Sequence, residues 1–191
     1  YDRHGSANDR MLSRYLLGCI YRDMDNGPKA VRCYLEAVEQ ADTTDKNCDY
    51  RVLCRLYGQL TELYKMSNLP KEALQELDKY IYYAEKAGDT VSACFGHEAM
   101  IYLHYALGDT VSALSKVEDC RNRYLEHGMH EEAAGVYPVL IYVCIERGQF
   151  SKARYYMDIY ERESGLFDSS NNILAGREHY YKIRGMYSLG V

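Results

Sequence analysis

The chain has 191 residues, 27% of them charged, and a formal net charge of −5 at pH 7. Its Lys and Arg residues are scattered among acidic residues rather than grouped, so we expect no nucleic acid to bind through this segment. The longest nearly uninterrupted apolar stretch, residues 136–145, is about half as long as a membrane-spanning helix. The sequence therefore predicts no membrane span.

Apolar residues at helical spacing predict helices along most of the chain. In chain order, the predicted helices occupy residues 11–24, 29–41, 50–66, 71–87, 91–107, 110–127, 131–147, 151–164 and 173–189. The turns between paired helices are short, which favours antiparallel hairpins. The sequence therefore predicts a single all-α domain of about nine helices, with units at about 11–49, 50–88, 91–128 and 131–165 and a half unit at 171–191.

Two prolines agree with these boundaries and a third conflicts with them. Pro28 and Pro70 fall in the first turn of a predicted helix, where the missing N–H would have no helical partner anyway. Pro138 falls inside a predicted helix, where it removes a backbone donor and crowds the carbonyl of Ala134. We therefore expect a kink or a late helix start at Pro138.

The cysteines give no sign of a disulfide framework. Seven is an odd number, no CxxC pair occurs, and such frameworks stabilise small secreted domains without a sizeable core. We expect most of these cysteines to be reduced thiols in the core. Cys48, in the polar stretch 41–49, is the thiol we most expect to be exposed.

An alanine recurs in the same local setting at Ala30, Ala73, Ala113 and Ala153, at intervals of 43, 40 and 40 residues. A period of this length indicates a helical repeat array. Small side chains at these positions let the two helices of a hairpin approach closely. Five residues before each alanine stands a residue that tolerates the left-handed conformation closing a helix: Asp25, Asn68, Gly108 and Gly148.

The first unit resembles a tetratricopeptide repeat. The family's pattern of Leu-Gly, aromatic, Ala, aromatic and Ala is met by Leu17, Gly18, Tyr21, Ala30, Tyr34 and Ala37. Later units keep less of the pattern, and Ile101 and Ile141 stand in the position of Gly18. The resemblance implies an α-solenoid, a right-handed superhelix of antiparallel helix hairpins.

These units are longer than the usual tetratricopeptide repeat of about 34 residues. In this they resemble the long repeats of bacterial regulatory and sensor proteins. The resemblance implies a non-enzymatic module that binds a protein or peptide, as the sensory or scaffolding part of a bacterial signalling protein. We expect the chain to be a fragment of a longer protein, either cytoplasmic or the extracytoplasmic part of a membrane-anchored one.

An alternative is a structural scaffold that associates with itself. The final predicted helix carries apolar residues such as Ile183 and Tyr187, and no further helix follows it to cover them. Terminal repeats usually need a polar outer face to stay soluble. A homodimer through this terminal helix therefore remains open at this point.

The resemblance also implies where a ligand binds, because the first helix of each pair lines the concave groove in such arrays. Carried over by position, the groove set comprises Tyr15, Cys19, Arg22, Gly58, Glu62, Lys65, Glu98, Tyr102, Tyr105, Pro138, Tyr142, Ile145, Tyr180, Arg184 and Tyr187. Tyrosine has a large rigid ring with a polar tip, which suits it to gripping a peptide. Periodicity does not decide whether these tyrosines line the groove or pack between helices.

Signals for chemistry are weak. Cys94, His97 and His104 share one predicted helix, but a structural metal site normally takes four ligands and no fourth is evident. His104 better fits the position that Tyr21 and Tyr64 hold in earlier units. No GxSxG, HExxH, phosphate-binding or dinucleotide motif occurs. We therefore expect no catalytic residues, no metal and no cofactor.

Overall fold

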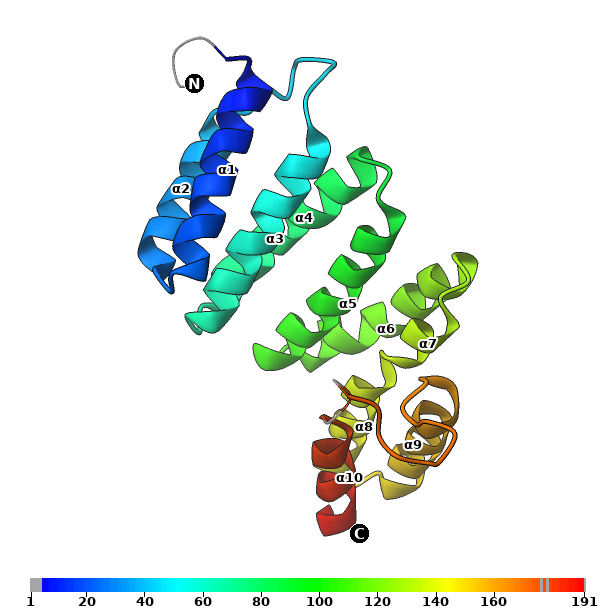
Figure 1. The fold of residues 1–191 in the computed structure, drawn as a ribbon. Helices are drawn as coiled ribbons and strands as arrows, with labels where there is room; N and C mark the ends of the chain where they lie inside the picture. Colours follow the sequence, from blue (N-terminus) through cyan, green and yellow to red (C-terminus); the bar gives the residue numbers. More distant parts are fainter. Residues whose placement is uncertain (1–4, 176, 178, 191) are drawn as a thin grey trace. The chain divides into compact units, whose positions relative to one another are not determined.

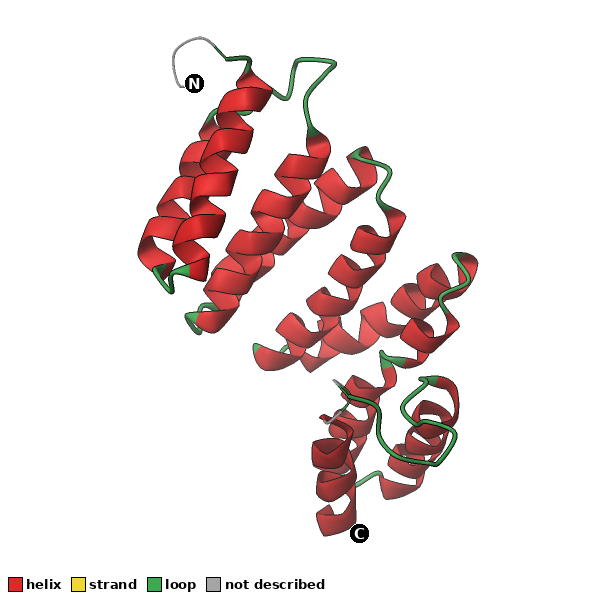
Figure 2. Cartoon of the chain, viewed as in Figure 1, coloured by secondary structure: helices red, strands yellow, loops and turns green. Residues whose placement is uncertain are grey.

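The computed structural model describes residues 5–175, 177 and 179–190, which form helices joined by short loops (Figures 1 and 2). The helices are α1 (Ala7–Asp23), α2 (Gly27–Glu39), α3 (Tyr50–Met66), α4 (Pro70–Lys86), α5 (Thr90–Ala106), α6 (Thr110–Glu126), α7 (His130–Ala134), α8 (Tyr137–Glu146), α9 (Phe150–Glu163) and α10 (His179–Gly190). The predicted all-α class is confirmed. Among the described residues, none of the helices combines the length and apolar character that crossing a membrane would require.

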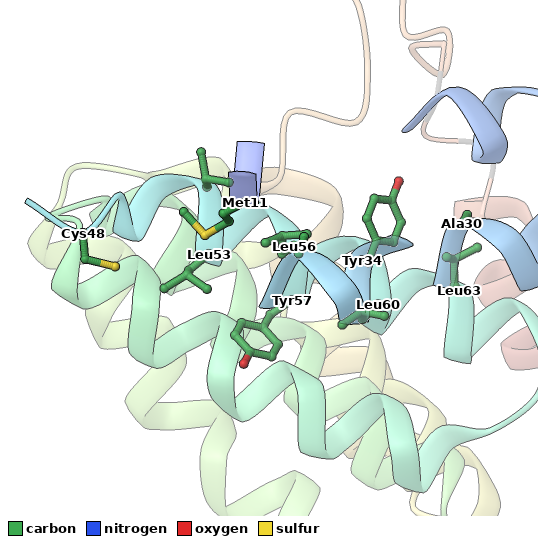
Figure 3. Packing of buried hydrophobic residues seen from close by; sticks show 11 residues of the cluster. Met11, Ala30, Tyr34, Cys48, Leu53, Leu56, Tyr57, Leu60 and Leu63 are labelled. Atoms are coloured by element: carbon green, nitrogen blue, oxygen red, sulfur yellow. The ribbon is translucent and has the colours of Figure 1, made fainter. Parts of the chain in front are cut away.

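The chain divides into two compact units, Tyr1–Leu103 and His104–Val191. In the first unit, α1 packs against α2 and α3 against α4, and both α1 and α2 contact α3. The core between these hairpins contains Tyr34 of α2 with Leu56 and Leu60 of α3, all fully buried (Figure 3). A second cluster joins Leu77 of α4 to Met100 of α5. Burying side chains of this size stabilises a fold by about 1.5–3 kcal/mol each, so the repeat-to-repeat contacts are a main source of stability.

The turn inside each hairpin uses a left-handed residue at the predicted position. The backbone angle φ is 57° at Asp25 and at Asn68, 77° at Gly108 and 65° at Gly148. The following N–H then bonds back to the helix, as from Asn26 to the carbonyl five residues earlier at 2.8 Å. These bonds satisfy carbonyls that a helix end otherwise leaves without partners. The four predicted turns are confirmed.

A glycine on α1 makes room for a tyrosine on α2. A Cβ atom at Gly18 would overlap two carbons of the Tyr34 ring, and the Tyr34 hydroxyl donates to Sγ of Cys19 at 3.6 Å. In the fourth repeat the same two positions hold Ile141 and Met157, both fully buried in one cluster. The later repeat therefore fills the same space with a larger residue on the first helix and a slimmer one on the second.

The second unit contains α6 to α10 and the last turn of α5. α8 packs against α9, α6 contacts α7 and α8, and α10 lies on α8 and α9. The first helix of the fourth repeat is interrupted, since α7 ends at Ala134 and α8 begins at Tyr137, with Pro138 in its first turn. The late helix start expected at Pro138 is confirmed, and the interruption explains why the described residues contain ten helices rather than the nine predicted.

The final helix begins later than predicted. α10 starts at His179 rather than at Ile173, because the chain before it forms a loop with its own hydrogen bonds. A carboxylate oxygen of Asp168 accepts from the N–H groups of Ser170 and Asn172, each at 2.8 Å. Ile173 and Phe167 pair through their backbones in an isolated antiparallel β-bridge. The N–H of Leu174 also donates to the carbonyl of Leu166 at 2.9 Å, and together these bonds hold the chain before α10 in a loop.

The expectation for Cys48 is wrong. Cys48 is 8% exposed and belongs to the core cluster of the first unit (Figure 3). Its N–H donates to the carbonyl of Asp45 at 3.0 Å, and this turn carries the side chain inward although the surrounding sequence is polar. Of the seven cysteines, only Cys19 is not buried.

Candidate functional site

The predicted groove residues lie on α1, α3, α5, α8 and α10. In the first unit, Nη1 of Arg22 donates to Oε1 of Gln59 at 2.7 Å, which links α1 to α3. Lys65 pairs with Glu62, with 2.8 Å between Nζ and Oε1. Both members of this pair are exposed at the end of α3. This part of the predicted set is therefore a charged surface held by local contacts.

The remaining predicted residues of the first unit are half-buried. Tyr15 packs on Tyr34 with 6.0 Å between ring centroids, and burial is the main reason that the pKa of Tyr15 is raised. Glu98 and Tyr102 of α5 are also half-buried. The tyrosines here thus combine packing with a partly accessible ring.

A pocket of about 630 Å³ lies in the first unit among α3, α4 and α5. Its lining residues are Arg51, Cys54, Arg55, Gly58, Gln59, Thr61, Glu62, Leu77, Tyr80, Asp89, Ser92, Phe95, Gly96 and Ala99. This volume lies within the range of about 300–1,000 Å³ that is usual for ligand sites. Gly58 and Glu62 belong to the predicted groove set, so the pocket coincides with part of it.

Sequence reasoning did not find the other features of this pocket. Arg51 and Arg55 lie one turn apart on α3, and Tyr80 comes from α4, the second helix of its hairpin. Burial is the main reason that the pKa of Tyr80 is raised. The available signal was the pair of basic residues four apart on a predicted groove helix, followed by Gly58.

In the second unit the predicted Tyr105 and Tyr142 meet. Their rings stack with centroids 6.0 Å apart and planes 15° from parallel, and the Tyr105 hydroxyl donates to Oε1 of Glu146 at 2.5 Å. Burial, followed by this bond to a carboxylate, raises the pKa of Tyr105 well above its usual range. Pro138, assigned to the groove by position, is buried instead.

The α10 residues of the predicted set contact α9. Tyr180 is 9% exposed and its hydroxyl donates to Oε1 of Glu161 at 2.7 Å, while Nη1 of Arg184 lies 3.3 Å from the same oxygen. Burial and this bond raise the pKa of Tyr180 to about 12. The Arg184 guanidinium also lies over the Tyr187 ring, 5.8 Å from its centroid. Tyr180 therefore packs inside the second unit rather than lining a groove.

The histidines considered as ligands have local partners. Nδ1 of His104 lies 3.3 Å from the carboxylate of Asp109, just beyond the same helix. Nε2 of His97 lies 3.8 Å from Glu85. Within the residues that the structure describes, no three His, Cys, Asp or Glu side chains gather as a metal site would require.

Comparison with solved structures places this arrangement among known helical arrays. The chain superposes on BtubC (BKLC) from P. vanneervenii with a TM-score of 0.72 and 13% identity, over 96% of this chain and 74% of that one. It superposes on a kinesin-light-chain protein of Podosopora anserina with nearly identical TPR-like repeats, with a TM-score of 0.61 and 13% identity, over 95% and 90% of the two chains. The fold is that of a tetratricopeptide-like repeat array. No protein-family model and no curated protein matches the sequence.

Two further solved structures have this fold. Aspartyl phosphate phosphatase F from Bacillus subtilis gives a TM-score of 0.71 at 10% identity, over 98% of this chain and 46% of that one. The Rap conjugation gene regulator of the plasmid pLS20, in complex with the Phr* peptide, gives 0.62 at 17% identity, over 94% and 52%. The chain thus spans about half the length of each of these two proteins. At such identities the repeat array shares their fold, and its function requires its own argument.

Proposed function

We propose that this tetratricopeptide-like array is a non-enzymatic module that binds a peptide or protein, as the sensory or scaffolding part of a bacterial regulatory protein. The observation that carries the proposal is the pocket of about 630 Å³ in the first unit. It is lined by charged, aromatic and small residues of α3, α4 and α5, and it coincides with groove positions. The pLS20 regulator, which has the same fold, was solved with a peptide bound.

Half-buried tyrosines supply a second reason for a peptide ligand. Tyr102, Tyr105 and Tyr142 each leave part of a rigid ring accessible on the first helices of their repeats. Such rings provide contact area at low entropic cost, and a polar tip that bonds backbone groups. A peptide ligand gains from both, because its own backbone must be ordered on binding.

The test is selection of peptides from a displayed random library on the immobilised chain, followed by calorimetric titration of a selected peptide. Replacing Tyr102, Tyr105 and Tyr142 by Ala should weaken binding about tenfold or more without unfolding the chain. Tyr155→Ala is the matched control, since this ring is 63% exposed on α9, a second helix. Failure to select any peptide, or equal weakening by the control, would count against the proposal. If the triple variant unfolds, the rings belong to the core.

Self-association is the second candidate, and α1 favours it more than α10 does. Large apolar side chains are exposed every fourth residue along one face of α1 and at the residue that caps its C-terminal end: Leu12, Leu16, Ile20 and Met24, which are 40–68% exposed. On α10, Ile183 is fully buried and only Tyr181 and Leu189 among the large apolar residues described there are exposed. Light scattering over a concentration range tests this candidate. A dimer lost in Leu16→Glu but kept in Leu189→Glu would assign the contact to α1, and a strict monomer would exclude it.

A further inference from the structure

A continuous row of apolar side chains is exposed along α1 and at its C-terminal cap. The row consists of Leu12, Leu16, Ile20 and Met24 and is called the α1 ridge below. Residues four apart lie one above the other on a helix, and the twelve residues from Leu12 to Met24 rise by about 18 Å. The α1 ridge is therefore one connected surface, and connected apolar surfaces mark sites of interaction in a way that scattered single residues do not.

Most of the α1 ridge lies outside the face through which repeats pack on one another. Three leucines of α3 are buried in the core cluster that also contains Tyr34 of the first repeat: Leu53, Leu56 and Leu60. Their counterparts 43 residues earlier on α1 are Arg10, Ser13 and Leu17. Of the α1 ridge, only Ile20 has a counterpart in that cluster, Leu63. A repeat packed on α1 in the same way would therefore leave Leu12 and Leu16 uncovered.

The arginines of α1 are directed towards neighbouring helices and away from the α1 ridge. Nε of Arg10 donates to Oε1 of Gln40, the cap of α2, at 3.0 Å. Arg14 pairs with a carboxylate of α2. Nη1 of Arg22 donates to Oε1 of Gln59 on α3 at 2.7 Å. The basic groups of this helix are therefore held at its contacts with α2 and α3.

Both ends of the α1 ridge carry exposed carboxylates. Asp9 stands three residues before Leu12, and Asp23 stands three residues after Ile20, so each shares a face with its end of the ridge. Hydrogen bonds from Ser6 lower the pKa of Asp9, which keeps this carboxylate ionised at neutral pH. Asp23 pairs with Arg22, but Asp25 adds a second exposed carboxylate beside Met24. The α1 ridge is therefore an apolar surface with an acidic group at each end.

This geometry favours a helix over an extended peptide. The backbone N–H and C=O groups in the middle of α1 bond within the helix, so none remain to pair with a second strand. A helix satisfies its own backbone groups and presents side chains every three or four residues that pack beside such a ridge.

The charges disfavour a second copy of α1 as the occupant. In a parallel arrangement, ridge against ridge, Asp9 would approach Asp9 of the other chain. In an antiparallel arrangement, it would approach the end that carries Asp23 and Asp25. Like charges repel in both cases, whereas basic side chains at the ends of a different helix would be attracted.

We propose that the α1 ridge binds an amphipathic helix of a partner protein, with apolar residues on one face and a Lys or Arg at each end of that face. The apolar residues pack beside Leu12, Leu16 and Ile20. The basic residues pair with Asp9 at one end and with the carboxylates beside Met24 at the other, about 21 Å away. This surface adds a second contact to the proposed function and does not depend on the pocket among α3, α4 and α5.

The probes are two fluorescein-labelled synthetic helices of about 18 residues with the same leucine face. One carries Lys at both ends of that face, and the other carries Glu at the same positions. Fluorescence polarisation measures their binding to the full chain. We expect the Lys helix to bind at least about ten times more tightly than the Glu helix at about 0.1 M salt. The difference should shrink at about 1 M salt, where the Debye length falls from about 10 Å to about 3 Å.

Two sets of variants separate the apolar contact from the charges. The double variant Leu12→Gln and Leu16→Gln should weaken binding of the Lys helix about tenfold or more. Val111→Gln is the matched control, because Val111 is a 77% exposed apolar residue of α6. The double variant Asp9→Asn and Asp23→Asn should remove the preference for the Lys helix without weakening the Glu helix. Circular dichroism melting checks the fold, and the Asn variants change only exposed groups if the Gln variants do not fold.

Equal binding of the two helices, or no binding of the Lys helix by the folded chain, overturns the inference. We expect light scattering to show a monomer in the absence of probe, and a dimer that Leu16→Gln abolishes would assign the α1 ridge to a second copy instead. The variant that lacks Tyr102, Tyr105 and Tyr142 should bind the Lys helix as the wild type does. Loss of this binding in that folded variant would place the helix in the groove, whereas failure of peptide selection alone would count against the proposed groove and leave the α1 ridge intact.

Discussion

Gly18→Ala tests the packing between the first two helices. The added Cβ would overlap the ring of Tyr34, which is fully buried and cannot swing away. Overpacking a well-packed core costs about 1–3 kcal/mol. Replacing Gly by Ala inside a helix recovers about 1 kcal/mol. We therefore expect the free energy of unfolding to fall by up to about 2 kcal/mol.

The Tyr34→Leu background shows whether the ring is responsible. With the ring removed, Gly18→Ala should avoid the overpacking cost and stabilise the helix by about 1 kcal/mol, so the two substitutions should couple by about 1–3 kcal/mol. Urea unfolding of all four proteins, followed by far-ultraviolet circular dichroism, measures this coupling. Gly185→Ala is the control for helix propensity alone, because a Cβ there meets nothing within 4 Å. An equal loss from Gly18→Ala in both backgrounds would refute the packing argument.

Three further predictions address the turns, the tyrosines and the thiols. Gly148→Ala should cost about 1 kcal/mol, because φ is 65° and the added Cβ touches nothing; thermal melting that shows no loss would contradict the left-handed turn. Burial raises the pKa of Tyr57 to about 12, so the folded state keeps this proton when the unfolded state loses it near pH 10. The contribution of the protonated Tyr57 to the free energy of unfolding is complete below about pH 10 and is lost as the pH rises towards about 12. The free energy of unfolding, measured with urea over this range, should therefore fall less with rising pH in Tyr57→Phe than in the wild type. Cys19, the single cysteine that is not buried, should react with a thiol reagent well before the others, and rapid reaction of several thiols in the folded chain would contradict the burial described.

The sequence by itself determined the helices and their turns. Alanines recur at a period of about forty residues because small side chains let the two helices of a hairpin approach closely. The residues five positions before them recur because the turn requires a left-handed backbone conformation. Residue type alone decides how small a side chain is and how well it tolerates a positive φ, which is why the left-handed turns at Asp25 and Gly148 were predicted correctly. The late helix start at Pro138 was also predictable, because proline lacks a backbone N–H and has a fixed φ whatever its surroundings.

Tertiary structure decided which side chains are buried and which meet. Cys48 is buried because a turn directs it inward, and α10 begins late because Asp168 and Ile173 take up local backbone bonds. The pocket could not be read from periodicity, since it needs the ring of Tyr80 to lie between Gly58 and Gly96 of two other helices. Residues far apart in sequence create it, and helical spacing carries no information about which neighbouring helix fills the space beside a glycine. The sequence therefore specified the repeating scaffold through local backbone preferences, whereas the candidate site arose only when three helices packed together.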